Sequence, residues 1–259
     1  MQRLWVRYEH AGKTAFGTLH GERVHEHVGD MFGASDATGT QHALADIRLL
    51  SPSAPTKVVA LWNNFHALAA KLGLADCEEP LYLLKAPNSW SAHGAPIAVP
   101  RRAAKVAFEG ELAIVIGRTA AGVAEEDALA HVFGYTCAND VTAADILHRD
   151  ASFTQWDRAK GLDTFCPMGP AIATGLDPKT LVVTTRLNGE VRQHYPISDM
   201  RFPVERLVSL ISFDLTLHPG DVILCGTSVG VGSMKPGSLV EVEIGGIGTL
   251  ANRYGQTYR

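Results

Sequence analysis

The sequence predicts a mainly β protein with a few short helices. The chain has 259 residues, of which 25 are glycine and 13 are proline, and these residues repeatedly interrupt short apolar stretches. Short strands bounded by turn residues favour a closed or folded-over sheet over parallel strands joined by helices. No G-x-G-x-x-G or G-x-x-x-x-G-K-[ST] sequence opens a predicted helix, so a nucleotide-binding fold is not expected.

Residues 1–55 are predicted to form a small β-rich N-terminal subdomain. Apolar and polar side chains alternate over residues 4–9, and residues 11–14 supply a turn before a second short strand. Residues 51–55 contain two prolines, which remove backbone donors and restrict the residues before them. We place the boundary there, so that residues 56–259 form the larger domain.

Three amphipathic helices are expected in the larger domain. Apolar residues recur at helical spacing over residues 65–72 and again over residues 204–211. A third helix is expected over residues 125–133, because it opens on acidic residues and is followed by Gly134. The remainder is predicted to be strands, including a hairpin whose turn is Asn-Gly at residues 188–189.

The composition is that of an ordinary globular protein. Hydrophobic residues make up 46% of the chain and charged residues 19%, which excludes a mainly disordered chain. The net charge is −4 and the sequence pI is about 6.2, so neither nucleic acid nor an anionic membrane is an expected partner. The start of the chain lacks the apolar stretch of a signal peptide, and a cytoplasmic protein is expected. Consistent with that, the cysteines are isolated and expected to be reduced: Cys77, Cys137, Cys166 and Cys225.

The most informative segment for chemistry is the apolar, β-branched stretch of residues 106–116. It is predicted to be a buried strand, and the period of two places Glu109 and Glu111 on one face, about 7 Å apart. Burying two adjacent anions is unfavourable unless a positive group, such as a metal cation, neutralises them. The alternative is the exposed polar face of an edge strand.

Asp140 ends a second strand-like segment, over residues 134–142. If it converges on Glu109 and Glu111, the three form an all-oxygen site, which selects Mg²⁺, Mn²⁺ or Ca²⁺ over zinc. The alternative is a turn, since Asn-Asp pairs are typical of turns.

Two further segments suit an anionic substrate. Lys160 lies in an apolar, glycine-rich stretch and near a metal could hold an oxyanion; the alternative is a salt bridge to Asp157 or Asp163. Residues 225–232 are glycine-rich, so their backbone N–H groups can approach an anion, and the Thr227 hydroxyl adds a donor for a substrate carboxylate.

In this order the segments resemble the fumarylacetoacetate hydrolase superfamily, including its 2-hydroxyhepta-2,4-diene-1,7-dioate isomerase and acylpyruvase-like members. The resemblance covers residues 57–256 and rests on Glu109 and Glu111, Asn139-Asp140 and residues 160–170, 226–230 and 246–252. It implies a mixed β-roll catalytic domain, often a homodimer, with Mg²⁺ or Mn²⁺ held by Glu109, Glu111 and Asp140. It also implies that Lys160, Gly226 and Thr227 contact a small carboxylic acid substrate.

The chain departs from the family pattern at several positions. Hydrolytic and decarboxylating members commonly carry a His and a Glu on a short lid helix, where this chain has Leu68 and Lys71. His66 is a candidate catalytic base from a shifted position; the alternative is a structural histidine. Ala144 replaces a frequent arginine and Ser228 a usual proline, which indicates an unusual substrate.

The first functional hypothesis is a metal-dependent enzyme acting on a small 2-oxo or 2-hydroxydienoate acid through a metal-stabilised enolate. Lys160 would lie near the developing charge and Thr227 on a carboxylate. Because ketonisation needs a proton donor and no activated water, the missing lid pair favours an isomerase or decarboxylase. The alternatives are a carbon–carbon bond hydrolase on a 2,4-dioxo acid and a catalytically silent protein that binds metal and carboxylate.

Two other clusters are not expected to be functional. His20, His25 and His27 lie among glutamates in a predicted exposed hairpin, and a metal site there is not expected. Arg101 and Arg102 begin a short basic run that is predicted to be a solvated loop.

Overall fold

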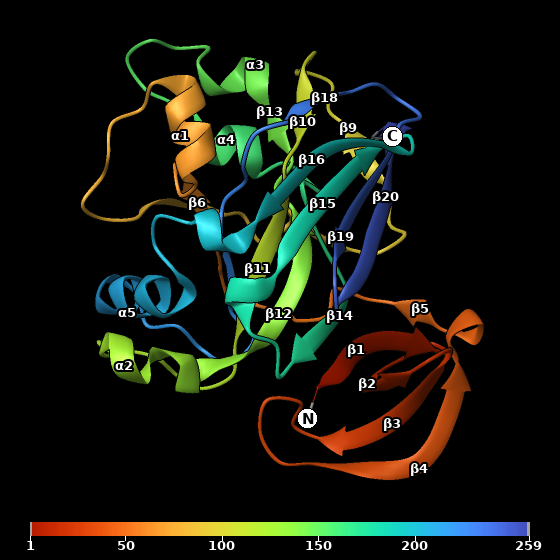
Figure 1. Ribbon diagram of the computed structural model, residues 1–259. Coiled ribbons are helices and arrows are strands. Elements are labelled where there is room, and N and C mark those ends of the chain that lie inside the picture. Colours follow the sequence, from red (N-terminus) through yellow and green to blue (C-terminus); the bar gives the residue numbers. More distant parts are fainter. Residues whose placement is uncertain (1, 258–259) are drawn as a thin grey trace.

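The computed structural model describes residues 2–257 and consists mainly of β-strands (Figure 1). The strands form a 12-stranded, a 5-stranded and a 3-stranded sheet. Side chains of the two larger sheets share one hydrophobic core, which therefore lies between the sheets. The prediction of a mainly β protein with few short helices is confirmed.

The 12-stranded sheet runs through the whole molecule. Along its main path the strands are β4 (Ser35–Ala43), β3 (Arg23–Gly29), β2 (Lys13–His20), β1 (Arg3–His10), β14 (Cys166–Thr174), β12 (Val132–Asn139), β11 (Gly110–Ile116), β17 (Val222–Leu224), β6 (Val58–Trp62) and β7 (Leu81–Lys85). Two short strands lie off this path, β5 (Arg48–Leu49) beside β1 and β8 (Trp90–Ala92) beside β14.

The other two sheets are smaller. The 5-stranded sheet has the order β16 (Glu190–Pro196), β15 (Val182–Leu187), β19 (Leu239–Ile244), β20 (Gly248–Thr257) and β9 (Ile97–Val99). The 3-stranded sheet has the order β13 (Thr142–Ala143), β10 (Val106–Phe108) and β18 (Gly232–Met234). The predicted hairpin is confirmed, since Asn188 and Gly189 join β15 to β16 with φ of 54° and 85°, both of which an Asn-Gly turn accommodates.

The α-helices lie on the side of the molecule away from the N-terminal strands (Figure 1). The α-helices are α1 (His66–Leu72), α2 (Glu125–Ala128), α3 (Ala144–Leu147), α4 (Trp156–Lys160) and α5 (Val204–Asp214), and single 3-10 turns occur at Leu44–Asp46, Leu129–His131, Pro178–Thr180 and Ile197–Asp199. The predicted helices at residues 65–72 and 204–211 are thus present, and Gly73, with φ of 64°, ends α1.

The prediction of one helix over residues 125–133 is wrong in its second half. The helix stops at Ala128, and Val132 is already the first residue of β12. Val132 pairs with Ile116 of β11 and Gly134 with Val115, so ladder hydrogen bonds replace the helical ones. Tertiary pairing here overrides a local helical pattern.

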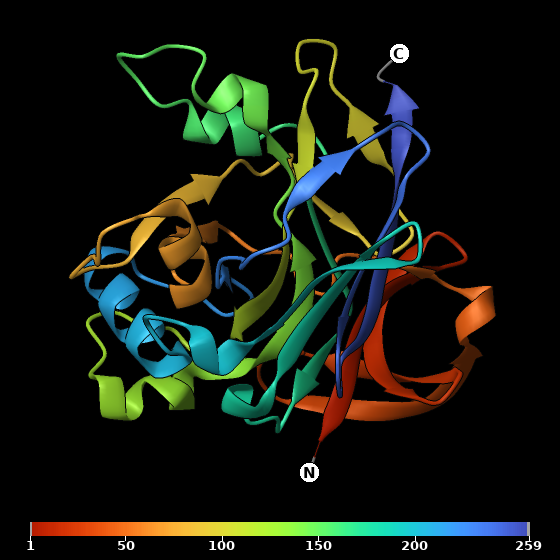
Figure 2. The ribbon, with the colours of Figure 1, turned by 45° about the horizontal axis from the view of Figure 1, so that its top comes forward.

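The N-terminal strands continue the main sheet and curl beside it (Figure 2). Strand β1 pairs with β14 through Arg3–Thr174 and Trp5–Ile172 and with β2 from Leu4 to His10. The N-terminal segment is therefore β-rich, as predicted. Its treatment as a subdomain that ends at residue 55 stays a prediction.

Strand β11 is the centre of the core, and all seven of its residues are buried. Leu112 and Ile114 face the core shared with α5 and the 5-stranded sheet, whereas Ala113 and Val115 face a second cluster that includes Trp5. Fully burying each large aliphatic side chain contributes about 1.5–3 kcal/mol. The core thus holds β11 firmly, and with it the residues at the start of the strand.

The four cysteines form no disulfide, as expected. Cys137, Cys166 and Cys225 are buried, and burial raises the pKa of the Cys137 and Cys166 thiols to about 12. No helix in the described part of the chain is long and apolar enough to span a membrane.

A buried carboxylate away from the candidate site supports β6 and β17. Asp221 accepts hydrogen bonds from the backbone N–H groups of Thr56, Lys57 and His218 and pairs with the Lys57 ammonium at 2.5 Å. Asp221→Asn is expected to lower the free energy of unfolding by about 1–3 kcal/mol, because buried donors lose a charged acceptor. Urea denaturation measures the change, and Asp36→Asn, in the exposed part of β4, is the control. Equal stability of the two variants would contradict this role.

Candidate metal and substrate site

The predicted strand over residues 106–116 is interrupted at Glu109. Strand β10 ends at Phe108 in the 3-stranded sheet, and β11 begins at Gly110 in the 12-stranded sheet. The prediction of one continuous strand is therefore wrong, although the segment is buried as expected. Glu109 lies at the step between the two sheets, and Glu111 is the second residue of β11.

Three side chains from other parts of the chain form hydrogen bonds with the backbone N–H and carbonyl groups of Gly110. Its carbonyl accepts hydrogen bonds from the Tyr195 hydroxyl at 2.5 Å and the Thr227 hydroxyl at 2.9 Å, and its N–H donates to Gln193 Oε1 at 3.0 Å. A Cβ atom at this position would lie 2.0 Å from Thr185 Oγ1, so only glycine fits between β11 and β15. These contacts fix the backbone between the two glutamates.

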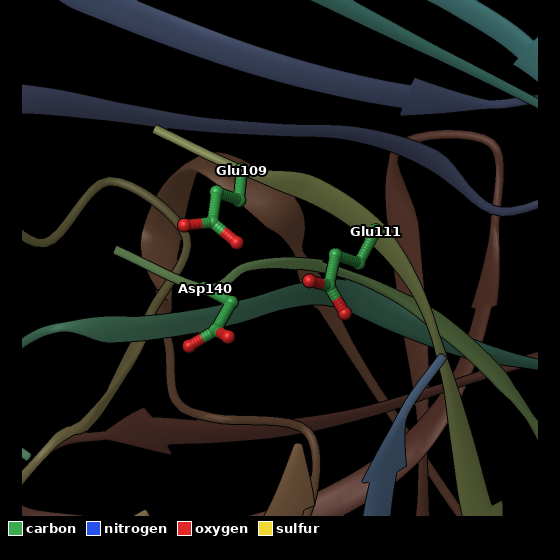
Figure 3. A group of neighbouring side chains, drawn as sticks. All are labelled: Glu109, Glu111 and Asp140. Carbon is green, nitrogen blue, oxygen red and sulfur yellow. The ribbon is translucent and has the colours of Figure 1, made fainter. Parts of the chain in front are cut away.

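Asp140 follows the last residue of β12 and completes a group of three carboxylates (Figure 3). Its backbone N–H donates to the carbonyl of Glu109 at 2.9 Å, which ties the two loops together. One carboxylate oxygen from each of Glu109, Glu111 and Asp140 lies within 4.8 Å of the others. The structure brings together the three residues that the sequence singled out, and we call them the triad.

Burial argues against the alternatives for these residues. The side chains of Glu111 and Asp140 are fully buried, and that of Glu109 is 13% exposed. An exposed edge-strand face for the two glutamates is therefore wrong. Glu109 marks the side of the triad that is nearest to solvent.

Two buried lysines neutralise part of this negative charge. Lys160, the last residue of α4, donates to Asp140 Oδ2 at 2.5 Å, to Thr142 Oγ1 at 2.8 Å and to Glu109 Oε2 at 3.1 Å. Its partners are thus triad carboxylates, and the alternative of a salt bridge to Asp157 or Asp163 is wrong. Lys85, the last residue of β7, donates to Asp140 Oδ1 and, at 2.9 Å, to the carbonyl oxygen of Phe165.

The pKa shifts in the triad differ in sign. Burial, together with the nearby charge of Asp140, raises the pKa of Glu111 well above its usual value of 4.5. Burial acts in the same direction on Asp140, but the ammonium groups of Lys160 and Lys85 outweigh it and lower the pKa of this carboxyl. Burial would lower the pKa of Lys160, yet the triad carboxylates raise it above 10.5. Glu111 is therefore the triad member whose charge is least compensated.

The triad fits a hard divalent cation. Glu111 Oε2 accepts a hydrogen bond from the Gly226 N–H at 2.8 Å, but Glu111 Oε1 is buried and has no hydrogen-bond partner in the described part of the chain. A buried carboxylate oxygen without a hydrogen-bond partner is unfavourable unless a positively charged group binds it. Three carboxylates outnumber two lysines by one negative charge, and an all-oxygen set suits Mg²⁺ or Mn²⁺.

The glycine-rich loop lies directly against the triad. Gly226, with φ of 88°, directs its N–H to Glu111, and an added Cβ would lie 3.3 Å from the Cβ of Asn64. The Thr227 hydroxyl donates to the Gly110 carbonyl and accepts from Gln193 Nε2 at 2.8 Å. In this structure Gly226 and Thr227 thus order the triad, and their predicted contact with substrate stays a prediction.

His66 forms no hydrogen bond or ion pair with the triad in the described part of the chain. It is exposed at the start of α1, where Arg201 and, to a smaller extent, His66 lower the pKa of the exposed Asp76. Asn64, two residues before His66, is anchored because its side-chain amide donates a hydrogen bond to the Cys225 carbonyl at 2.8 Å. The role of His66 as a base stays a prediction.

Sequence reasoning missed Lys85, Gln193 and Tyr195. A signal for Lys85 was available, because it follows the apolar residues 81–84 and a lysine at the end of such a stretch is poorly placed for solvent. No local signal identifies Gln193 and Tyr195, since their contacts to Gly110 span more than 80 positions.

The clusters that were expected to have no function contain no comparable site. His20 is exposed and stacks near His25, with ring centroids 4.7 Å apart. Among the described residues, the triad alone forms a group of three or more potential ligand side chains this close together. Arg101 and Arg102 are exposed, as predicted.

Comparisons with known proteins agree with this geometry. The family model described as fumarylacetoacetate (FAA) hydrolase C-terminal matches residues 57–254, which is most of the chain. The chain belongs to the fumarylacetoacetate hydrolase family. A second model, described as Rv2993c-like, N-terminal, matches residues 3–52. The triad and Lys160 both lie within the region that the hydrolase model covers.

Three family members bear most directly on function. A structure titled 2-hydroxyhepta-2,4-diene-1,7-dioate isomerase from Mycobacterium marinum is 40% identical, with a TM-score of 0.90, over 99% of this chain and 99% of that one. Oxaloacetate tautomerase YisK from Bacillus subtilis is 36% identical over 229 residues, which are 83% of this chain and 75% of that protein. Fumarylpyruvate hydrolase from Pseudomonas aeruginosa, in complex with Mn²⁺ and pyruvate, is 26% identical with a TM-score of 0.73, over 80% of this chain and 98% of that one.

Proposed function

We propose that this protein is a divalent-metal-dependent enzyme that isomerises a small 2-oxo dicarboxylic acid by moving a proton between carbon and oxygen. The observation that carries the proposal is the buried triad, in which one oxygen of Glu111 has no hydrogen-bond partner in the described part of the chain while Lys160 bonds Glu109 and Asp140. The names of the Mycobacterium marinum and Bacillus subtilis proteins, an isomerase and an oxaloacetate tautomerase, support this reaction class.

Glu109, Glu111 and Asp140 would hold Mg²⁺ or Mn²⁺. When bound, such an ion supplies Lewis-acid polarisation of a 2-oxo group and of a neighbouring carboxylate. The complex of the Pseudomonas aeruginosa protein with Mn²⁺ and pyruvate supports a metal and a 2-oxo acid as the ligand pair. The substrate would approach from the side of Glu109, which is the only partly exposed member of the triad.

Lys160 would supply the compensating positive charge. Its raised pKa keeps the side chain an ammonium group at neutral pH, so it can donate a hydrogen bond to an oxygen on which negative charge develops. The hydroxyl of Thr227 would reorient from the Gly110 carbonyl to a substrate carboxylate. Tyr195 and Gln193 would continue to hold the Gly110 peptide.

The residues of α1 favour isomerisation over hydrolysis. Cleavage of a carbon–carbon bond needs an activated water in addition to a proton donor. Leu68 and Lys71 occupy the positions of the expected acid–base pair, and Leu68 can accept no proton. His66, exposed at the start of the same helix, is the candidate base.

Turnover of the enol form of oxaloacetate tests the proposal. With Mg²⁺ or Mn²⁺ present, we expect the enol absorbance to decay faster than without protein, and we expect Glu109→Ala to abolish the acceleration. Acylpyruvates and a hydroxymuconate-type dienoate serve as comparison substrates. Pyruvate release from acylpyruvates without any enol turnover would overturn the isomerase proposal in favour of a hydrolase. Tight oxalate binding without any turnover would instead indicate a binding protein.

A further inference from the structure

Asp140 is held by two different lysines, one on each carboxylate oxygen. Lys160 Nζ donates to Oδ2 at 2.5 Å, and Lys85 Nζ donates to Oδ1. All three side chains are buried, so solvent cannot replace either contact. A carboxylate whose two oxygens are both bonded in this way has one fixed orientation.

The two lysines differ in what else they contact. Lys160 also donates to Glu109 and to Thr142, so each of its three N–H groups has an acceptor within the site. Lys85 contacts a single triad residue, and its second acceptor is the backbone carbonyl of Phe165. Lys160 is thus shared across the triad, whereas Lys85 connects Asp140 to the backbone around it.

The elements that carry the two lysines also differ in rigidity. Lys85 ends β7, which pairs with β6 over five residues, including Lys85 itself opposite Val58. Lys160 ends α4, a helix of five residues followed by Gly161. Lys85 therefore comes from a paired strand, and Lys160 from a short helix beside a loop.

We propose that Lys85 is a positioning residue that fixes the carboxylate of Asp140 as a metal ligand. The inference rests on the proposed function, because it requires a cation in the triad. A positive charge near a metal weakens binding by repulsion, but correct orientation of a ligand strengthens it. We infer that orientation dominates at Lys85, since its ammonium bonds the carboxylate oxygen of Asp140 that Lys160 does not bond and is itself held by the Phe165 carbonyl.

The affinity of the metal-free protein for Mn²⁺ tests this inference without any use of activity. Isothermal titration calorimetry and the electron paramagnetic resonance signal of free Mn²⁺ both give the dissociation constant. We expect Lys85→Met to weaken Mn²⁺ binding by about 10- to 100-fold. A role of Lys85 as a charge alone predicts the opposite, because removal of a nearby cation would tighten binding. Unchanged or tighter binding would overturn the inference.

Lys57→Met is the matched control. Lys57 also pairs with a buried aspartate, Asp221, so this variant loses an ion pair that includes no triad residue. We expect it to lower the melting temperature and to leave the Mn²⁺ dissociation constant within about 2-fold of wild type. If Lys57→Met weakened Mn²⁺ binding as much as Lys85→Met, loss of stability would explain both and the positioning role would be overturned.

If Lys85→Met does not fold, the Mn²⁺ affinity of Lys85→Gln provides the test in its place. Glutamine retains an N–H donor for Asp140 without the charge, so we expect weaker binding than wild type but a smaller loss than in Lys85→Met. Mn²⁺ binding as tight as wild type or tighter in Lys85→Gln would overturn the inference. If the wild-type protein itself binds no Mn²⁺, the proposed function fails; if wild type binds and the Lys85 variants bind equally well, only the present inference fails.

Discussion

Glu111→Gln is expected to abolish binding of a divalent cation while the metal-free protein stays at least as stable as wild type. Glutamine has the shape of glutamate, and its side-chain oxygen can still accept the Gly226 N–H. The substitution removes a buried charge beside Asp140 and Glu109, one oxygen of which has no hydrogen-bond partner among the described residues. Neutral groups in such a position avoid the desolvation cost of a charge. A substitution in a buried core that costs no stability but eliminates metal binding is the signature of a ligand.

Thermal denaturation with and without Mn²⁺ measures both parts of this expectation. Wild type should melt at a higher temperature with Mn²⁺, because a ligand that binds the folded state stabilises it. Glu111→Gln should show no such increase. Glu243→Gln, which breaks a partly exposed ion pair with Arg186, is the control and should respond to Mn²⁺ like wild type. A full Mn²⁺ response in Glu111→Gln would contradict the assignment of the triad.

The raised pKa of Glu111 also predicts a pH dependence of the metal-free protein. Above pH 4.5 the folded state binds a proton at Glu111 that the unfolded chain has released, so folding stability falls as pH rises toward the higher folded pKa. The shifts of Asp140 and Lys160 act outside this range, below pH 3.8 and above pH 10.5. The stability difference between Glu111→Gln and wild type should therefore grow in favour of the variant from pH 5 upward, as measured by urea denaturation.

Lys160→Met is expected to lower kcat by about 10²- to 10³-fold, the usual effect of removing one donor to a developing oxyanion. Metal binding should be retained, because the triad keeps its three carboxylates and loses an ammonium group that competes for two of them. A loss in kcat with Mn²⁺ affinity at least as tight as wild type separates Lys160 from Lys85. The two lysines bond the same aspartate, but Lys160→Met should lower kcat, whereas Lys85→Met should weaken Mn²⁺ binding.

Steady-state kinetics with enol oxaloacetate and Mn²⁺ titration measure these two effects. Lys105→Met, at an exposed position before β10, is the control and should retain wild-type kcat. A kcat near the wild-type value in Lys160→Met would contradict the role of Lys160 as donor. Loss of Mn²⁺ binding in that variant would instead show that Lys160 acts through the metal ligands.

The triad could be predicted from the sequence because its members stand out against their own neighbours. Charged residues in apolar stretches, such as Glu111 and Asp140, need compensation wherever the chain folds. The break at Glu109 could not be predicted, because it depends on Tyr195 and Gln193 clamping Gly110 from a strand far along the chain. The early end of α2 has the same cause, since pairing with β11 takes Val132 into a strand.

The partner of a buried charge was harder to predict than the charge itself. The sequence left a salt bridge to nearby Asp157 or Asp163 open as the alternative for Lys160, but both are exposed, and the actual partners lie directly after β12 and at the step before β11. Sequence distance is a poor guide once strands from separate segments meet in one sheet. The pairing of Lys85 with Asp140, 55 positions away, was hidden for the same reason.

The position of Mn²⁺ in a crystal of the wild-type protein tests the central claim most directly. Anomalous scattering from crystals grown in excess Mn²⁺ locates the ion independently of the protein density. We predict a single strong peak bounded by oxygens of Glu109, Glu111 and Asp140, with Lys85 still bonded to Asp140. No peak at this position, with the three carboxylates bonded only to lysine and backbone groups, would contradict the account.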